Sequence, residues 1–280
     1  MEEDLALSIP FSRPSNISRV CIERLKLHQP EQVDLTTYPS SKLAAVLVLL
    51  YEKAGELRVL LTTRSKALRS HPGQTALPGG KVDETDHDII GTAYREANEE
   101  VRLPLASPHI HTICTLRPFM SPYRLLVTPV VAILDDLAVL EGLQASAGEV
   151  EHIFDHPLEA LLNPTIARKE PLVSIGSEHW PYETELHNTT DSRIATLGNT
   201  TYRMHRFRSA ASAIKGLTAD ILILAAEIAF EKKPTFERWG PGQLVGLTSI
   251  LLFLKENGED VEGTQRTFSV VTGALAVAST

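Results

Sequence analysis

Two short apolar runs followed by one amphipathic segment constrain the fold of this chain most narrowly. Lys42–Tyr51 (KLAAVLVLLY) and Glu56–Arg64 (ELRVLLTTR) are rich in valine and leucine, and a break containing Gly55 separates them. Such runs around a glycine-containing break are typical of a β-hairpin. From Asp88 to Val101, apolar side chains recur at helical spacing. Strands followed by a helix predict a single α/β domain.

The rest of the chain predicts further strands and helices around that unit. Residues 109–119, 124–134 and 200–207 are expected strands, a short helix should begin near Asp155, and residues 209–232 and 242–256 are expected helices. Residues 163–199 are polar and broken by proline and glycine, which favours an insertion loop. We therefore expect an N-terminal arm (1–40), one domain (41–256) with an insertion around 163–199, and a C-terminal tail (257–280).

The overall charge restricts the ligands that the chain can attract. Over 280 residues the net charge is -8 at pH 7. A surface of this sign has no general attraction for nucleic acid or for an anionic membrane, so we expect neither as a partner. A small anionic ligand would need local help from a metal ion or from a basic pocket.

An acidic cluster lies at the end of the amphipathic segment. Glu96, Glu99 and Glu100 stand at i, i+3 and i+4, so on a helix they share one narrow face. Three carboxylates repel one another unless a cation joins them, and Mg²⁺ prefers oxygen ligands. Arg95 is four residues before Glu99 and can orient that carboxylate. The alternative interpretation is a solvated acidic helix face.

The sequence around this cluster, GGKVDETDHDIIGTAYREANEEVRL, resembles the Nudix box. The match falls on the positions that define the box: Gly80, Arg95, Glu96, Glu99, Glu100 and Leu103. The segment between Gly80 and Arg95 is one residue longer than the commonest form, with Asp86 in place of glutamate. Arg102 replaces a glycine that would end the helix in a left-handed conformation, at a cost of about 1 kcal/mol if the geometry is kept.

The loop before the box resembles the coenzyme A diphosphatase subgroup of that family. LLTTRSKALRSHPGQTALPGG carries Arg64, Lys66, Arg69 and His71 in a chain of negative net charge. Clustered arginine suits phosphate binding, whereas the plain alternative is a polar loop. The longer box with Asp86 is also that subgroup's form. Lys215 departs from it, because tryptophan is usual there, and the likeness covers residues 42–224.

The resemblance implies a Nudix fold, an α/β/α sandwich with a mixed sheet and extra C-terminal helices. It also implies hydrolysis of the diphosphate bond of coenzyme A or its acyl derivatives to 3',5'-ADP and 4'-phosphopantetheine. Mg²⁺ or Mn²⁺ would be held by Glu96, Glu99, Glu100 and the Gly80 carbonyl, with Arg95 in the catalytic set. Substrate phosphates would be bound by a separate group of residues, Arg64, Lys66, Arg69 and Gly79.

Several alternatives remain open at the level of sequence. The general base is Glu96, or one of the acids Glu149 and Glu151 of the later GEVE segment. The substrate is CoA or acyl-CoA, or alternatively an oxidised nucleoside triphosphate or an NADH-type dinucleotide. A domain that only binds its ligand is a further alternative, although such domains commonly lose the carboxylates that are present here. A homodimer is one candidate assembly.

The terminal sequences and the cysteines bear on the compartment. Cys21 and Cys114 have no spacing typical of a disulfide framework or a metal site, which indicates a reducing compartment. The N-terminal MEEDLALSIPFS begins acidic, unlike a secretory or mitochondrial signal, and the C-terminal VAST does not match the peroxisomal tripeptide. We expect a cytoplasmic protein, with the peroxisome as the alternative that the family likeness suggests.

Overall fold

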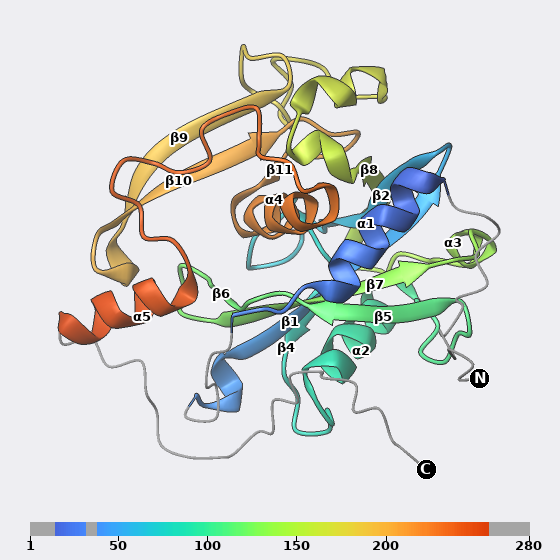
Figure 1. Cartoon of the computed structure of the whole chain (residues 1–280), viewed down its shortest axis with the longest axis horizontal. Coiled ribbons are helices and arrows are strands. Elements are labelled where there is room, and N and C mark those ends of the chain that lie inside the picture. Colours follow the sequence, from blue (N-terminus) through green and yellow to red (C-terminus); the bar gives the residue numbers. More distant parts are fainter. Residues whose placement is uncertain (1–14, 32–37, 258–280) are drawn as a thin grey trace, which may run out of the picture.

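A mixed eight-stranded sheet forms the centre of the computed structural model, which describes residues 15–31 and 38–257. Strands β3, β2, β1, β7 and β5 lie side by side, and β8, β4 and β6 pair with β2, β1 and β7 (Figure 1). β1 is parallel to β7 and antiparallel to β2 and β4. The strands are β1 (Leu43–Lys53), β2 (Glu56–Arg64), β3 (Thr75–Ala76), β4 (Gly79–Lys81), β5 (Ile110–Thr115), β6 (Phe119–Met120), β7 (Leu126–Leu134) and β8 (Val150–Pro157).

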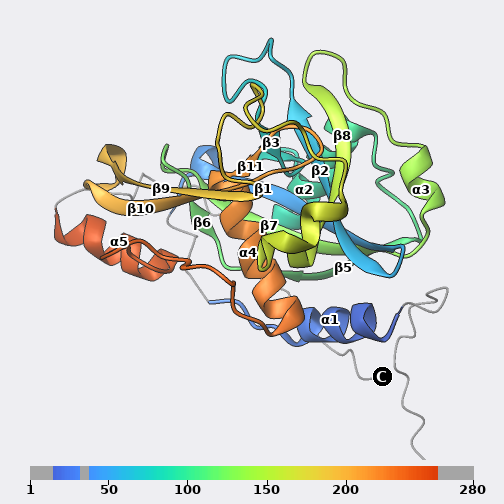
Figure 2. The ribbon, with the colours of Figure 1, turned by 90° about the horizontal axis from the view of Figure 1, so that it is seen from above.

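Helices cover both faces of this sheet, so the predicted α/β/α sandwich is confirmed. α2 (Ile89–Val101) packs on one face, and α1 (Asn16–Leu27) and α4 (Gly216–Phe230) pack on the other (Figures 1 and 2). In β1, Leu47 belongs to the core beneath α2, whereas Val48 belongs to the core beneath α1 and α4. Because successive side chains of a strand point to opposite faces, a strand covered on both sides is apolar throughout.

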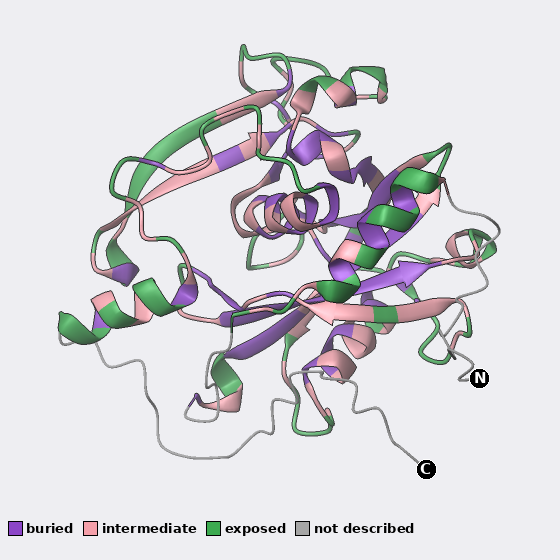
Figure 3. Cartoon of the chain, in the orientation of Figure 1, coloured by how far each residue is buried: buried purple, intermediate pink, exposed green. Residues whose placement is uncertain are grey.

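A smaller three-stranded sheet stands beside the sandwich and leads into α4. It consists of β9 (His187–Ile194), β10 (Thr200–Phe207) and β11 (Ile214–Lys215), and α5 (Leu247–Glu256) follows later in the chain. Buried residues concentrate along β1 and β7, whereas β9 is largely exposed (Figure 3). The short helical turns are α3 (Ala138–Glu141), η1 (Ser40–Lys42), η2 (Leu158–Leu161), η3 (Pro164–Lys169) and η4 (Ala195–Leu197).

The predicted hairpin, the predicted helix after Asp88 and a short helix after Asp155 (η2) are present, but the predicted start of that short helix at Asp155 is wrong. Asp155 lies in β8, and its carboxylate accepts hydrogen bonds from Arg58 Nε at 2.8 Å and from the Tyr51 hydroxyl at 3.0 Å. These partners lie on β2 and β1, so the carboxylate links neighbouring strands of the sheet and does not cap a helix. The helical turn begins three residues later, at Leu158.

Several boundaries also differ from those expected. Residues 163–199 contain η3 and β9, and α1 lies within the segment expected to be an arm. Helix α4 begins at Gly216 because the two residues before it, Ile214 and Lys215, pair with β10. Most of the expected tail, residues 258–280, lies outside the described residues. In the described ranges, no helix has the length and apolar character needed to cross a bilayer.

Candidate active site

Helix α2 presents an apolar face to the core and carries the acidic cluster near its end. Asp88 caps the helix, because its Oδ1 accepts a hydrogen bond from the Gly91 N–H at 2.7 Å. Ala93 and Ala97 are fully buried against the sheet. The helix ends at Arg102 in the left-handed conformation, with φ 59° and ψ 30°. The geometry that glycine normally favours is therefore kept, at a cost of about 1 kcal/mol.

Arg95 fixes two of the three glutamates. Its Nη1 donates hydrogen bonds to Glu96 Oε1 at 3.0 Å and to Glu99 Oε2 at 3.3 Å. Its Nε and Nη2 donate to the two oxygens of Asp86 at 2.7 Å and 3.0 Å, and Nη2 also donates to the Lys81 carbonyl. A guanidinium held on so many sides has little freedom, so it sets the positions of both glutamates.

Glu100 is the most buried glutamate of the cluster, with 9% of the residue exposed. Its Oε2 accepts a hydrogen bond from the Gly79 N–H at 3.2 Å, and Arg64 Nη1 lies 3.7 Å from its Oε1. Burial, with smaller contributions from the charges of Glu96 and Glu149, raises the pKa of Glu100 to about 7. Burial also raises the pKa of Glu96. The ionised form of both carboxylates is therefore disfavoured here, and a nearby cation would stabilise it.

The glycine pair of β4 lets the backbone lie directly against the acidic cluster. A Cβ on Gly80 would lie 2.4 Å from the carboxylate carbon of Glu96. A Cβ on Gly79 would lie 2.3 Å from the carbonyl oxygen of Ala45, and Gly79 has a φ of +157°. Neither position has room for a side chain unless a neighbour moves.

The donor set of the cluster suits a hard divalent cation, although the side chains do not form a ready-made cage. In the part of the chain that the structure describes, no three His, Cys, Asp or Glu side chains are gathered into a metal-binding group. Glu96 and Glu99 turn toward Arg95, and Glu100 turns toward the Gly79 amide. The donors are carboxylate oxygens, two of them with raised pKa values, which is the chemistry that Mg²⁺ or Mn²⁺ would satisfy.

The loop between β2 and β3 brings only part of the predicted basic set to this site. Arg64 faces Glu100 and lines the adjacent cavity, as does Gly79. Lys66 instead forms an exposed ion pair with Glu178 at 3.0 Å, and Arg69 is exposed and is not among the cavity-lining residues. The basic residues of this loop are therefore divided between the cavity and the outer surface.

The two acids of the GEVE segment lie in different surroundings. Both Glu149 and Glu151 are exposed at the start of β8. The charge of Glu149 acts on Glu100, as its contribution to the raised pKa of Glu100 shows. The pKa of Lys66 is raised chiefly by Glu178, and Glu151 contributes a smaller attraction. Of the two acids, Glu149 is thus the one near the acidic cluster.

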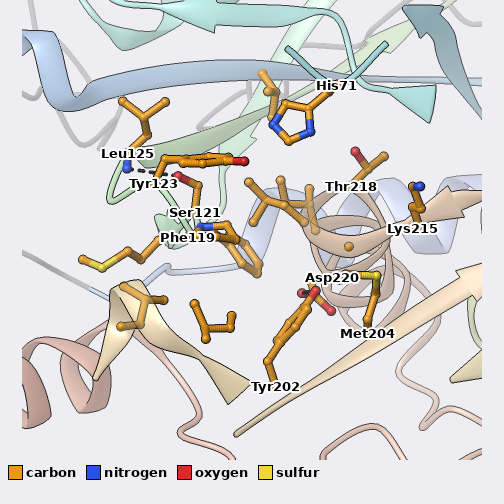
Figure 4. A pocket seen from close by; sticks show the side chains of 18 of the residues that line it. His71, Phe119, Ser121, Tyr123, Leu125, Tyr202, Met204, Lys215, Thr218 and Asp220 are labelled. Atoms are coloured by element: carbon orange, nitrogen blue, oxygen red, sulfur yellow. Dashed lines mark hydrogen bonds between the residues drawn. The ribbon is translucent and has the colours of Figure 1, made fainter. Parts of the chain in front are cut away.

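A cavity of about 630 Å³ opens beside the glycine pair. Figure 4 shows side chains that line it, among them Phe119, Tyr202 and Asp220. Gly79, Gly80 and Arg64 line one part of it, and other parts are lined by residues from β3, β6, β9, β10, α4 and α5 and from the loops between them. Much of this wall is apolar, with side chains such as Phe119, Met120, Leu197, Met204, Leu247 and Ile250. The space lies between the sandwich and the smaller sheet, so both parts of the fold shape the candidate site.

Sequence reasoning missed the polar groups on the far wall of the cavity. The Tyr202 hydroxyl donates a hydrogen bond to Asp220 Oδ2 at 2.7 Å, and both residues line the cavity (Figure 4). Burial raises the pKa of Asp220 to about 7, against the opposing effects of the Tyr202 hydrogen bond and two nearby arginines. Arg117 and Tyr123 also line the cavity. These residues come from separate segments, and no local pattern connects them.

Comparisons with known proteins agree with this architecture. A model of the NUDIX domain matches residues 41–174. Over 141 residues the chain is 40% identical to the Nudix hydrolase NudL of Yersinia enterocolitica, and the alignment covers 50% of this chain and 68% of that protein. The chain therefore belongs to the Nudix family, and its α/β architecture is the Nudix fold that the sequence predicts.

Two further relatives carry more specific names. The chain is 39% identical over 196 residues to Nudix hydrolase 15, mitochondrial, of Arabidopsis thaliana. This alignment covers 70% of the present chain and 61% of the Arabidopsis protein. It is 29% identical over 234 residues to peroxisomal coenzyme A diphosphatase NUDT7 of Mus musculus. This second alignment covers 82% of the present chain and 89% of the mouse protein. The chain thus spans less than two thirds of the length of the Arabidopsis relative.

Proposed function

We propose that this chain hydrolyses the diphosphate bond of coenzyme A and its acyl derivatives with the help of a divalent metal ion. The observation that carries the proposal is the placement of Glu96, Glu99 and Glu100 beside the Gly79–Gly80 backbone, with Arg64 lining the adjacent cavity. The site thus combines carboxylates that can bind a metal ion, an arginine that can bind phosphate and a cavity that can hold a substrate.

In the proposed reaction, a water oxygen attacks one phosphorus of the diphosphate and the bridging P–O bond breaks, which gives two phosphate monoesters. Mg²⁺ or Mn²⁺ on Glu96, Glu99, Glu100 and the Gly80 carbonyl would supply Lewis acidity toward the phosphate oxygens and lower the pKa of bound water. Arg95 keeps Glu96 and Glu99 in place through the hydrogen bonds described above.

Arg64 and Glu149 have distinct roles in this proposal. Arg64 pairs loosely with Glu100, at 3.7 Å, and so can turn its guanidinium to a substrate phosphate. Glu149 is the preferred general base of the GEVE pair, because it lies near Glu100, whereas Glu151 lies near Lys66. Proton removal from the attacking water needs a carboxylate within hydrogen-bond reach of the site.

Support for coenzyme A comes from the loop motif, from the size and apolar wall of the cavity and from the likeness to the mouse coenzyme A diphosphatase. The name of the Arabidopsis relative states no substrate, so oxidised nucleoside triphosphates and NADH-type dinucleotides are kept as the alternative substrates. A substrate panel separates these classes. We would compare initial rates on CoA, acetyl-CoA, NADH and an oxidised deoxynucleoside triphosphate at equal concentration, with Mg²⁺ and with Mn²⁺.

The proposal predicts the highest kcat/KM for CoA or acetyl-CoA, and no turnover in the presence of a chelator. Preferential cleavage of NADH or of the oxidised nucleotide would overturn coenzyme A as the substrate, although the proposed hydrolysis of a diphosphate bond would still hold. No metal-dependent turnover on any of the four would favour the binding-only alternative. Glu99→Gln serves as the matched inactive control, because it removes one proposed metal ligand on the helix surface.

A further inference from the structure

Two cations face each other on the smaller sheet. Arg206 of β10 and Lys215 of β11 are direct partners in the antiparallel register. Side chains at such positions lie on the same face with Cβ atoms about 4.5–5.5 Å apart, and like charges directly opposite destabilise the pair. A chain of net charge -8 has ample acidic residues to separate or neutralise this pair. The arrangement therefore calls for an explanation.

Within residues 15–31 and 38–257, neutral groups and no carboxylate hold the Arg206 side chain. Its Nη1 donates hydrogen bonds to Thr190 Oγ1 at 2.9 Å and to Asn188 Oδ1 at 3.4 Å, and the guanidinium carbon lies 5.4 Å from the centre of the Tyr182 ring. Three residues earlier on the same strand, Arg203 shows the contrasting arrangement. It pairs with Asp191 at 2.7 Å. The positive charge of Arg206 is thus fixed in place without an acidic partner in the described part of the chain.

Lys215 is the inner member of the pair. Among the residues that the structure describes, its ammonium group has no hydrogen-bond or ion-pair partner. The residue lines the cavity beside Thr218, at the start of α4 (Figure 4). Burial lowers the pKa of Lys215, and the neighbouring charge of Arg206 lowers it further. An anion beside this ammonium would relieve both effects.

Lys215 lines the same cavity as Gly79 and Gly80, the glycines that lie against the acidic cluster. The Thr75 hydroxyl donates a hydrogen bond to the Ser212 carbonyl at 2.6 Å, which ties β3 to the segment that enters β11. From β3 the chain continues directly to Gly79 and Gly80. Arg117, another cation of this cavity, differs from Lys215 because Glu31 and Asp220 both act favourably on its charge. Lys215 is therefore the better placed cation for an anionic ligand group.

We propose that Lys215 and Arg206 bind a phosphate monoester of the substrate that is separate from its diphosphate. This inference rests on the proposed function, in which the diphosphate occupies the site beside Gly79 and Gly80. In coenzyme A, the group of this chemistry is the 3'-phosphate of the nucleotide half. The pair thus selects substrates with a phosphorylated ribose, and the apolar wall of the cavity is left for the other half of the molecule.

Binding of the nucleotide product alone tests the proposal without any need for turnover. We would titrate the full chain with 3',5'-ADP and with 5'-AMP, which differ only in the 3'-phosphate, by isothermal calorimetry. The wild-type chain should bind 3',5'-ADP about ten- to a hundredfold more tightly, as expected for a charge-assisted contact. Lys215→Met and Arg206→Met should reduce this ratio toward one, and Lys215→Arg should preserve it.

Arg193→Met provides the matched control, because Arg193 is an exposed cation of the same small sheet whose strand partner is Thr201 and not Lys215. It removes the same unit of charge and should leave the ratio unchanged. Thermal melts check that each variant is folded. Lys215→Met keeps the length of the side chain and removes a like-charge repulsion, so its Tm should equal or exceed that of the wild type.

Hydrolysis separates failure of this inference from failure of the proposed function. On CoA, Lys215→Met should lower kcat/KM by about tenfold more than it does on dephospho-CoA. Equal losses on the two substrates, or equal binding of 3',5'-ADP and 5'-AMP by the wild-type chain, would overturn the inference. If the wild-type chain does not cleave CoA yet binds 3',5'-ADP preferentially through Lys215, the inference stands and the coenzyme A assignment fails.

Discussion

Replacement of Gly79 or Gly80 by alanine adds the same methyl group at two adjacent positions with different surroundings. At Gly80 the new Cβ would lie 2.4 Å from the carboxylate carbon of Glu96, which is the movable end of a side chain. At Gly79 it would lie 2.3 Å from the Ala45 carbonyl oxygen, which belongs to the backbone of the central strand. The first variant should therefore lose activity, and the second should lose stability.

The magnitudes follow from these distances. For an ordinary contact of about 3.4 Å, the Glu96 carboxylate must move by about 1 Å, and a displacement of about 1 Å at a catalytic group costs about a hundredfold in rate. Overpacking at Gly79 costs about 1–3 kcal/mol, and its φ of +157° adds strain of about 1–3 kcal/mol for a residue with a side chain. Together these costs of about 2–6 kcal/mol lower Tm by roughly 4–24 °C, at about 2–4 °C for each kcal/mol.

The assay combines a thermal melt with metal-dependent turnover for each variant. Gly80→Ala should melt within a few degrees of the wild type and turn over about a hundredfold more slowly. Gly55→Ala is the control, because Gly55 also has a positive φ but has nothing within 4 Å of its added Cβ. It should cost about 1 kcal/mol and leave kcat unchanged. Wild-type turnover by Gly80→Ala would refute the assigned position of Glu96.

Three further predictions test the site and the fold. Glu99→Gln and Glu100→Gln should each lower kcat by orders of magnitude without lowering Tm, because each replaces a proposed metal ligand by a neutral group of the same size; near-normal turnover would remove this helix as the metal site. Arg95→Lys cannot reach both oxygens of Asp86 and two glutamates at once, so the metal concentration needed for half-maximal activity, measured by titration with Mg²⁺, should rise about ten- to a hundredfold. Burial lowers the pKa of His156 to about 4, so between about pH 6.5 and pH 4 the unfolded chain binds more protons than the folded chain, and the free energy of unfolding should fall by about 3 kcal/mol as the pH drops through this range. His156→Leu should lose this part of the pH dependence in denaturant titrations. A variant whose stability depends on pH as the wild type does would contradict the lowered pKa of His156.

The parts of the site that lie within one sequence segment could be predicted from the sequence. The spacing of Glu96, Glu99 and Glu100 on one helix face depends only on helical periodicity, and Asp88 caps that helix as local rules suggest. The left-handed conformation of Arg102 could also be predicted, because the end of this helix requires that conformation whichever residue occupies the position. Local patterns therefore defined the acidic cluster and its supporting arginine.

The parts that depend on long-range pairing could not be predicted. Asp155 follows the pattern of a helix cap, yet its carboxylate is engaged by Arg58 and Tyr51 from other strands, so tertiary contacts override the local signal. The opposition of Arg206 and Lys215 depends on the register of two strands, and the cavity is formed by segments far apart in the chain. No periodicity in the sequence encodes these distances.

Identification of the products formed from CoA in water labelled with ¹⁸O tests the central claim most directly. The purified chain would be incubated with CoA and Mg²⁺, and the products would be identified by mass spectrometry, with a chelated sample as the control. We predict 3',5'-ADP and 4'-phosphopantetheine in equal amounts, with one ¹⁸O atom in the phosphate of one product and no products after chelation. Intact CoA under conditions in which the same preparation cleaves NADH or an oxidised nucleoside triphosphate would contradict the account.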